Sequence, residues 1–408
     1  MTRRGAVLTF LVVLSVLNYL DRVCISVAGV RMQADLGIPE DRWGWVLGVF
    51  YLSYGLFEIP TGAWGDRFGQ RRVITRIVVW WSVFTCLTGL VSSFPMLVAV
   101  QLLFGAGEAG AYPNMAGALG RWFRPTERAR TQGAVWAASR VGGAVAPLAV
   151  VPLMAALGWR AAFVIFGGLG AAWAAAWFAW YRDPPAGGGD AGHAGVPWGR
   201  LFRSRQVWLI LAMAWCYGWG SSFYLSRLHT YLVKGRGLTE AEMGYYAALP
   251  FVCGAVGNLA GGVLADRLSR RLGLRAGRRL VGSVALAASA ALLLTAAVTT
   301  GKAVGVAALA LGYGAMDCML PSNWANCQDI GGRFAGAVSG AMNTAVQAGA
   351  FTGSVLFGYL VGWFGYNAPL VPIAAMMLVS AGLFARIDPT RPLVPERPAP
   401  VAEDAACA

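Results

Sequence analysis

The sequence predicts an all-α membrane protein with twelve transmembrane helices in two pseudo-symmetric six-helix bundles. Three observations lead to this prediction. Hydrophobic residues make up 57% of the 408 residues and charged residues only 13%, long apolar runs recur along the chain, and one motif repeats 200 residues apart. A soluble domain has about 25% charged residues, so the composition excludes that class. The net charge of +14 does not indicate nucleic-acid binding, because the basic residues lie in short clusters between apolar runs.

Twelve apolar runs are long enough for membrane-crossing helices, which need about 20 residues each. The predicted spans are residues 6–29, 43–64, 73–92, 95–119, 132–156, 160–181, 206–231, 243–265, 280–300, 303–326, 335–361 and 367–386. The first run is not expected to be a cleaved signal peptide, since it is too long and two charged residues interrupt it.

The basic residues predict the orientation of the spans and the polar linker predicts the domains. With both termini cytoplasmic, 24 Lys and Arg fall on the cytoplasmic side and 6 on the other side, as the positive-inside rule requires. We expect an N-terminal bundle over 1–181, a cytoplasmic linker over 182–205, a C-terminal bundle over 206–387 and a disordered tail over 388–408. The seven Cys and two His show neither metal-site spacing nor a disulfide framework, so no metal or cofactor is expected.

The loops after spans 2 and 8 share a motif that we interpret as a gate or structural element. Its residues are Gly62, Asp66, Arg67 and Arg71, repeated as Gly262, Asp266, Arg267 and Arg271. Glycine lets helices approach closely, and aspartate can cap a helix while it bonds an arginine. One motif at the same place in two six-helix halves is typical of a duplicated transporter fold.

The pattern Gly-x-x-x-Asp-Arg-x-Gly-x-Arg-Arg resembles the corresponding loop of the major facilitator superfamily, and the resemblance extends over residues 1–390. It implies that spans 1, 4, 7 and 10 line a central cavity that opens alternately to each side of the membrane.

Seven ionisable side chains fall inside the predicted spans: Asp21, Arg22, Glu58, Glu108, Arg140, Arg227 and Asp317. Each costs roughly 2.5–3.5 kcal/mol at a helix centre, so each must pair, face water, or both.

Span 1 carries two adjacent charges that cannot pair with each other, because neighbouring helical residues point about 100° apart. Arg22 can offer a bidentate fork to an anionic substrate, while Asp21 exchanges a proton or holds a gate. Asn18 shares a helix face with both residues by its spacing. The alternative is a structural salt bridge between helices.

Span 4 contains Glu108 among small residues, in surroundings poor in water, where a carboxyl group can serve as a proton carrier; a hydrogen-bonded structural acid is the alternative. Arg140 in span 5 cannot lose its charge and requires a carboxylate partner. We expect Glu108, Asp21 or the substrate, through either a switchable bridge or a permanent one.

Three further charges are possible cavity residues. Asp317 in span 10 can balance the arginines, line the cavity or bond span 11. Arg227 near the outer end of span 7 can extend its guanidinium to the membrane interface. Glu58 is expected to serve an inner gate network, and His229 is not expected to be catalytic.

Two strings resemble the anion:cation symporter family, which includes bacterial sugar-acid and hexuronate permeases and the vesicular glutamate transporters. These are Asn18-Tyr19-x-Asp21-Arg22 and Phe104-Gly105-x-x-Glu108-Ala109-x-x-x-Pro113. The resemblance implies that an organic anion contacts Tyr19, Arg22, Tyr54 and Asn343, and that the protonatable acids are Asp21 and Glu108.

The sequence departs from that family at Gln101, where the family usually has an arginine that meets the span-1 aspartate. We interpret Arg140 as its replacement from the neighbouring helix, and we include both Gln101 and Arg140 among the substrate-binding residues.

These features predict a monomeric transporter in a bacterial inner membrane, which imports an organic carboxylate by proton-coupled symport and uses the proton gradient as its energy source. A sugar acid is the first candidate substrate. An exchanger of anions, or an effluxer of an anion or amphipathic compound, is the alternative. The sequence has no clustered nucleophile–base pair, which disfavours a membrane enzyme. It has no Walker-type loop, so the use of ATP is not expected. We also disfavour a transporter-like sensor, because no output domain is recognised.

Overall fold

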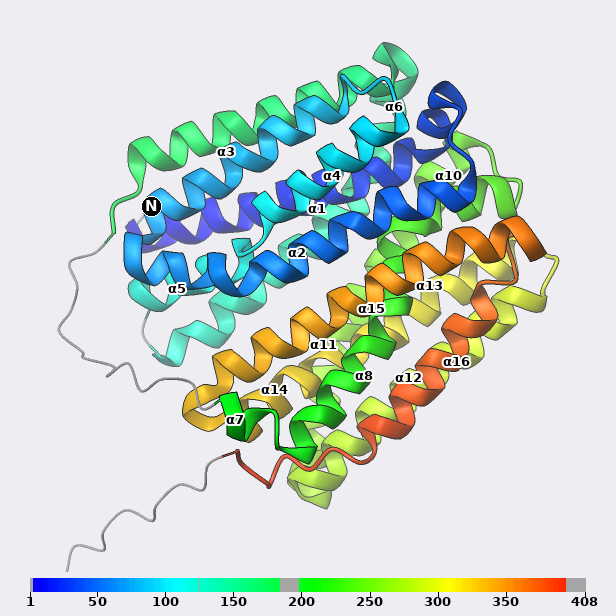
Figure 1. The fold of residues 1–408 in the computed structure, drawn as a ribbon. Coiled ribbons are helices and arrows are strands. Elements are labelled where there is room, and N and C mark those ends of the chain that lie inside the picture. The colour runs from blue at the N-terminus through cyan, green and yellow to red at the C-terminus, as the bar shows by residue number, and fades with distance from the viewer. Residues whose placement is uncertain (1–2, 124, 184–197, 394–408) are drawn as a thin grey trace, which may run out of the picture.

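The computed structural model describes residues 3–123, 125–183 and 198–393, and its description excludes the side chains at positions 59, 62, 63, 65–67, 120, 125–130, 132, 198, 333 and 335. Throughout these ranges every regular element is helical. Figure 1 shows two groups of long helices, one blue to green and the other green to red, lying side by side. The all-α prediction is confirmed.

The first group holds the predicted spans 1 to 6. Its helices are α1 (Arg3–Leu36), α2 (Glu40–Phe68), α3 (Gln70–Thr88), α4 (Phe94–Glu108), α5 (Ala111–Trp122) and α6 (Pro125–Trp180). Helix α6 contains two predicted spans, because Gly158 adopts φ 81° and ψ 162° and reverses the chain between them. A side chain would be strained at this positive φ.

The second group holds the predicted spans 7 to 12. Its elements are α7 (Trp198–Leu201), α8 (Arg205–Ser222), η1 (Phe223–Arg227), α9 (Leu228–Thr230), η2 (Tyr231–Gly235), α10 (Glu240–Tyr246), α11 (Ala248–Leu272), α12 (Leu274–Val298), α13 (Lys302–Cys318), α14 (Leu320–Gly331), η3 (Gly332–Phe334), α15 (Ala335–Phe364) and α16 (Leu370–Phe384). Span 7 therefore contains two π-helical turns, η1 and η2, a feature often found at functional sites.

Length and hydropathy identify seven membrane-crossing stretches among the described residues: Arg3–Leu36, Phe94–Leu119, Gly133–Trp180, Glu240–Leu272, Leu274–Val298, Lys302–Gly331 and Gly336–Phe364. The stretch in α6 holds two predicted spans, and the remaining four predicted spans fall on α2, α3, α8 with its π-helical turns, and α16. All twelve predicted spans thus coincide with helices.

Small residues bring the helices into backbone contact within and between the groups. In α15, a Cβ at Gly349 would lie 1.9 Å from the backbone oxygen of Trp215 in α8. Between the groups, a Cβ at Gly44 of α2 would lie 2.9 Å from the backbone oxygen of Ser354 in α15. Because lipid offers no hydrophobic drive for helix association, such close packing supplies much of the attraction.

We call the end of the molecule where α1 begins the terminal end, and the end where α1 reaches Leu36 the distal end (Figure 1). The terminal end is the one that the positive-inside rule predicts to be cytoplasmic. The predicted linker 182–205 and tail 388–408 lie mostly outside the described residues, so their bounds and those of the two predicted bundles stay predictions.

In each group an arginine near the start of the third span, α3 or α12, donates to a backbone oxygen near the end of the sixth span, in α6 or just after α16. Arg71 donates to the backbone oxygen of Phe178 at 2.5 Å, and Arg279 donates to that of Ile387 at 2.6 Å. An aspartate follows in both cases: Asp183 accepts from the backbone N–H groups that begin α3, and Asp388 pairs with Arg275 at 3.4 Å. The correspondence extends the repeat seen in the sequence to the packing of the two groups.

The glycine contacts predict a difference between two substitutions in α15. Gly349→Ala should lower the thermal midpoint, because its methyl group meets the backbone of α8; overpacking of this kind costs about 1–3 kcal/mol. Gly340→Ala is the matched control, since nothing lies within 4 Å of a Cβ at that position. Thermal unfolding of the two purified variants checks this, and equal midpoints would contradict the close approach of α8 and α15.

Candidate functional site

The centre of the first group contains a buried ion pair between α1 and α4. Arg22 donates from Nη2 to Oε1 of Glu108 at 2.5 Å, and Asn18 donates to the same oxygen at 2.7 Å. The side chains of Arg22 and Glu108 are 9% and 1% exposed. The second carboxylate oxygen of Glu108 is buried without a hydrogen-bond partner, so the carboxylate has an unused acceptor in the site.

A break in the fourth span places this carboxylate. Helix α4 ends at Glu108, and α5 begins after Gly110, whose φ of 83° lies in the left-handed region. A Cβ on Gly110 would also lie 2.3 Å from Oγ1 of Thr61, so only glycine fits. The side-chain amide of Asn114 donates to the carbonyl groups of Gly110 and Thr61 at 2.7 and 3.0 Å, which ties the start of α5 to α2. Discontinuous helices of this kind form the substrate sites of many transporters.

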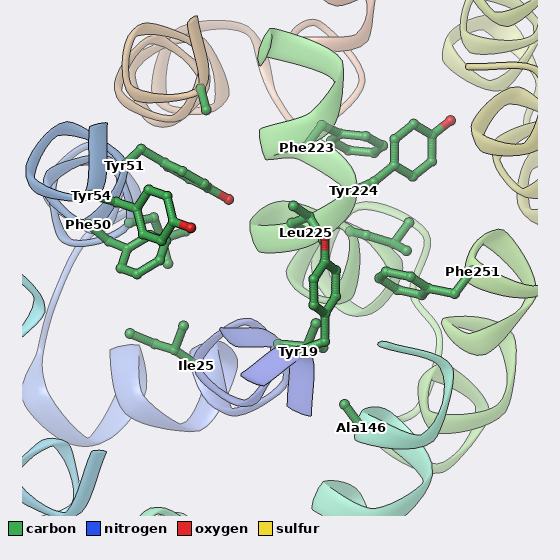
Figure 2. Close-up of a cluster of buried hydrophobic side chains, with 14 of the residues drawn as sticks. Tyr19, Ile25, Phe50, Tyr51, Tyr54, Ala146, Phe223, Tyr224, Leu225 and Phe251 are labelled. Carbon is green, nitrogen blue, oxygen red and sulfur yellow. The ribbon is translucent and has the colours of Figure 1, made fainter. Parts of the chain in front are cut away.

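Three aromatic rings surround the Arg22 guanidinium. Its central carbon lies 5.6 Å from the ring centroid of Tyr19, 5.1 Å from that of Phe50 and 4.9 Å from that of Tyr54. Figure 2 shows Phe50 and Tyr54 projecting from α2. It also shows Tyr19 projecting from α1, with its ring toward Leu225 of η1. The rings exclude water and contribute cation–π attraction of about 0.5–2 kcal/mol each.

A second buried ion pair joins the two groups. Arg140 of α6 approaches Asp317 of α13 at 2.8 Å, with side chains 8% and 0% exposed. Its Nη1 also donates to the hydroxyl of Tyr19 at 3.2 Å. The expectation that Arg140 pairs with Glu108 or Asp21 is wrong here, because those acids lie among α1, α3 and α4 while Arg140 faces α13.

Asp21 and Gln101 lie together in a small pocket that Thr85, Thr88 and Phe163 also line. Gln101 donates to Oγ1 of Thr88 at 3.3 Å, and an oxygen of Asp21 is buried without a partner. Arg140 therefore does not replace the missing arginine. Gln101 also lines an adjoining pocket together with Arg22. It therefore lies between Asp21, a predicted proton carrier, and Arg22, the predicted anion-binding residue.

Contacts across the groups continue on either side of this centre. Asn343 of α15 donates to Glu58 of α2 at 2.5 Å, which agrees with a gate contact but not with a free Asn343. Ser26 of α1 bonds Nδ1 of His229 at 2.8 Å, and Tyr51 bonds Ser226 at 2.5 Å. Buried His229 thus has a structural partner.

A network around Glu40 closes the distal end. Glu40, the first residue of α2, accepts hydrogen bonds from Tyr366 at 2.7 Å, Lys234 at 3.0 Å and Arg227 at 3.2 Å. All three donors belong to the second group. Arg227 is 1% exposed and also donates to the backbone oxygen of Ser354 at 2.8 Å. The expectation that Arg227 extends to the membrane interface is therefore wrong.

A second distal contact lies beside this network. Arg31 of α1 bonds the carboxylate of Glu240 in α10 and the backbone oxygen of Met154 at 2.8 Å. With the Glu40 network it ties the end of α1 and the start of α2 to the second group.

The repeated loop motif lies at the terminal end. The side chains of Gly62, Asp66 and Arg67 are outside the described part of the structure, whereas Arg71 stacks on Phe178 with its guanidinium carbon 4.2 Å from the ring centroid. In the second copy, a Cβ at Gly262 would lie 3.8 Å from the Pro321 side chain, and Asp266, Arg267 and Arg271 are exposed. A gating role for the motif stays a prediction.

Sequence reasoning missed three contributors. Glu40 has the position of an ordinary helix-capping acid, and only the distances show its three partners. Asp183 follows span 6 at a distance from the motif that it supports. The ring centroid of Tyr313 lies 5.8 Å from the Arg140 guanidinium carbon. In the sequence Tyr313 looks like any aromatic residue of a helix core, so its position could not be predicted.

Comparisons with known proteins agree with this architecture. The family model "Major Facilitator Superfamily" matches residues 11–354. A bacterial homologue of the human lysosomal transporter Spinster, in an inward-facing and unoccupied conformation, has a TM-score of 0.79 at 19% identity, with 94% of this chain and 96% of that chain covered. The chain belongs to the Major Facilitator Superfamily, and it is a transporter rather than an enzyme.

Several characterised or named transporters are similar in sequence. The "Probable sulfoacetate transporter SauU" of Cupriavidus necator is 32% identical, over 93% of this chain and 92% of that protein. The "Hexuronate transporter" of Bacillus subtilis is 27% identical over 95% of both chains. The "Probable L-galactonate transporter" of Escherichia coli is 33% identical, over 62% of this chain and 60% of that protein.

The distal network predicts the effect of removing its central charge. Glu40→Gln should shift the population toward distally open molecules by roughly tenfold, since hydrogen bonds to charged groups contribute about 1.5–3 kcal/mol each. Spin labels at Leu157 and Tyr245, exposed residues of α6 and α10 at the distal end, would report a longer distance. Glu242→Gln is the control, because Glu242 caps its own helix with Thr239. An unchanged distance distribution in Glu40→Gln would show that the network does not hold this end closed.

Proposed function

We propose that this chain is a secondary active transporter that imports a small organic carboxylate together with protons. The observation that supports the proposal is the Arg22–Glu108 pair. The carboxylate of Glu108, at the break in the fourth span, pairs with the buried guanidinium of Arg22, which stays charged. A substrate carboxylate is chemically equivalent to that of Glu108 and can form the same charge-assisted bonds.

The proposed cycle exchanges one carboxylate for another at Arg22. When Glu108 takes up a proton it no longer compensates the guanidinium, and Arg22 then binds the substrate carboxylate through its fork. On the other side of the membrane, loss of the proton restores the Arg22–Glu108 pair and displaces the substrate. Asp21 is the second proposed proton carrier, since its carboxylate has a buried unpartnered oxygen.

The other predicted binding residues have supporting positions in this scheme. Tyr19 and Tyr54 hold the guanidinium between their rings, and Gln101 adjoins both Arg22 and Asp21. Asn343 enters only if its bond to Glu58 opens, so we propose that it acts when the gate between α2 and α15 rearranges.

The conformation described here fits one half of an alternating-access cycle. The distal end is held by the Glu40 network and by the bond between Arg31 and Glu240, both of which join the two groups. We propose that this is the state that exchanges substrate at the terminal end, which is cytoplasmic if both termini are inside.

The names of the relatives support an organic anion as the proposed substrate. Sugar acids and sulfoacetate are therefore the first compounds to test. A bacterial inner membrane and a monomer complete the proposal, because a single copy contains both halves of the fold.

Arg22→Ala should reduce uptake at least about 30-fold, the loss that follows truncation of one partner of a buried charge pair. Uptake of labelled galactonate, glucuronate and sulfoacetate into proteoliposomes, with an inward proton gradient, measures it. Arg160→Ala is the matched control, because Arg160 pairs with Asp35 in the same group but is 45% exposed. Retained uptake in monodisperse Arg22→Ala protein would remove Arg22 from the site, and export of all three anions would favour efflux.

Glu108→Gln should abolish accumulation driven by a pH gradient while it retains exchange of substrate loaded on both sides. The amide resembles the protonated acid and cannot release a proton, so the substrate exchanges but is not concentrated. Counterflow and gradient-driven uptake in the same proteoliposomes separate the two activities. Concentrative uptake by Glu108→Gln would assign the coupling proton to another group.

A further inference from the structure

Arg140 is a second buried arginine beside Tyr19. A substrate with a single carboxylate, bound at Arg22, would leave Arg140 without a role in binding. Its guanidinium cannot lose its charge. A buried ion pair is seldom more stable than an apolar pair of similar size, so stability alone does not account for Arg140 and Asp317 between the two groups.

The two arginines lie within reach of one small molecule. Their guanidinium carbons lie 5.6 and 5.7 Å from the Tyr19 ring centroid, so they are separated by at most about 11 Å. Charge-assisted hydrogen bonds of about 2.7–2.9 Å at each end take up much of that length. A ligand that bridges them therefore has its two acidic groups only a few carbon atoms apart.

Each arginine pairs with a carboxylate of span 4 or span 10, which hold the same place in the two halves. Glu108 is the last residue of α4, before the break at Gly110. Asp317 is the penultimate residue of α13, and Met319, in helical conformation, separates α13 from α14. The structure thus contains two buried arginine–carboxylate pairs, one inside the first group and one between the groups.

We propose that the substrate is a small dianion whose first acidic group binds Arg22 and whose second replaces Asp317 on Arg140. This inference rests on the proposed function and specifies its substrate class. Two arginines and two carboxylates are neutral together, so a dianion restores neutrality only when two protons accompany it, one on Glu108 and one on Asp317.

The surroundings of Asp317 allow this exchange. Arg140 of α6 is the cation that faces it, and Tyr217 of α8 with Tyr313 and Cys318 of its own helix are the neighbouring titratable groups. Gly254 of α11 leaves room beside Oδ2, since a Cβ there would lie 2.8 Å from that oxygen. Arg22 and Arg140 both belong to the first group, whereas Asp317 belongs to the second. A dianion on both arginines therefore breaks a bond between the groups and couples binding to their rearrangement.

Matched ligand pairs test the proposal on the full-length protein. Galactarate and galactonate differ by one carboxylate, malonate and malonamate are nearly isosteric, and sulfoacetate can be set against isethionate. The dissociation constants, measured at acidic pH, should favour the dianion at least tenfold in one or more pairs. Equal or tighter binding of the monoanion in every pair that binds would overturn the dianion inference and leave the proposed function intact; failure of all six anions to bind would overturn both.

The double variant Arg140→Gln/Asp317→Asn removes both charges and leaves no uncompensated ion. It should reduce the preference for the dianion to less than threefold while the affinity for the monoanion stays within threefold of wild type. The control Arg160→Gln/Asp35→Asn removes an exposed ion pair of the first group and should keep the preference. A preference that persists without Arg140 would overturn the proposal.

Proton counting separates Asp317 from Asp21, the other proposed proton carrier. Reversal of the substrate gradient in proteoliposomes should give at least two protons per dianion for the wild type and one fewer per substrate for Arg140→Gln/Asp317→Asn, which keeps Asp21. A ratio of one for the wild type, or equal ratios for the two proteins, would show that Asp317 takes no proton and would exclude the exchange at Arg140.

Discussion

The ion pair between Arg22 and Glu108 is the interaction on which the rest of the structure depends. Arginine stays charged in a water-poor interior, and removal of one partner of a buried pair costs about 3–5 kcal/mol. The protein therefore has to supply a negative charge to Arg22 in every state. In the proposed cycle Glu108 takes a proton and an anion from outside has to replace it, so the proposed coupling of proton and substrate would follow from the cost of an unpaired guanidinium.

Two kinds of contact hold the groups together, and they have different chemistry. The central Arg140–Asp317 pair is almost fully buried, and a ligand's acidic group can replace Asp317 there. In the distal network the Glu40 side chain is 14% exposed and accepts from three donors at once, so a ligand's acidic group would have to satisfy all three to replace it. In the proposed cycle, substrate therefore acts directly on the central contact, while the distal contact keeps the distal end closed in its absence.

Hydropathy and motif spacing predicted the helices and the family, because the membrane constrains helix length and the duplicated loop is local in sequence. They also predicted that Asp21 and Arg22 face different partners, since the helical angle between neighbours is fixed. The partner of Arg140 could not be predicted, because it depends on how α6 crosses α13 between groups. The role of Glu40 was likewise invisible, since its three partners lie 187 to 326 residues away in the chain.

The aromatic residues around Arg22 determine what kind of anion can replace Glu108. Tyr19, Phe50 and Tyr54 have their ring centroids within 5.6 Å of the guanidinium carbon, while an N–H group of the guanidinium donates to the carboxylate of Glu108. Fully hydrated inorganic anions would lose their water against these rings without compensation. An organic anion instead places its carbon skeleton on the rings and its carboxylate on the N–H edge, so the same residues that keep water from the ion pair also select the substrate class.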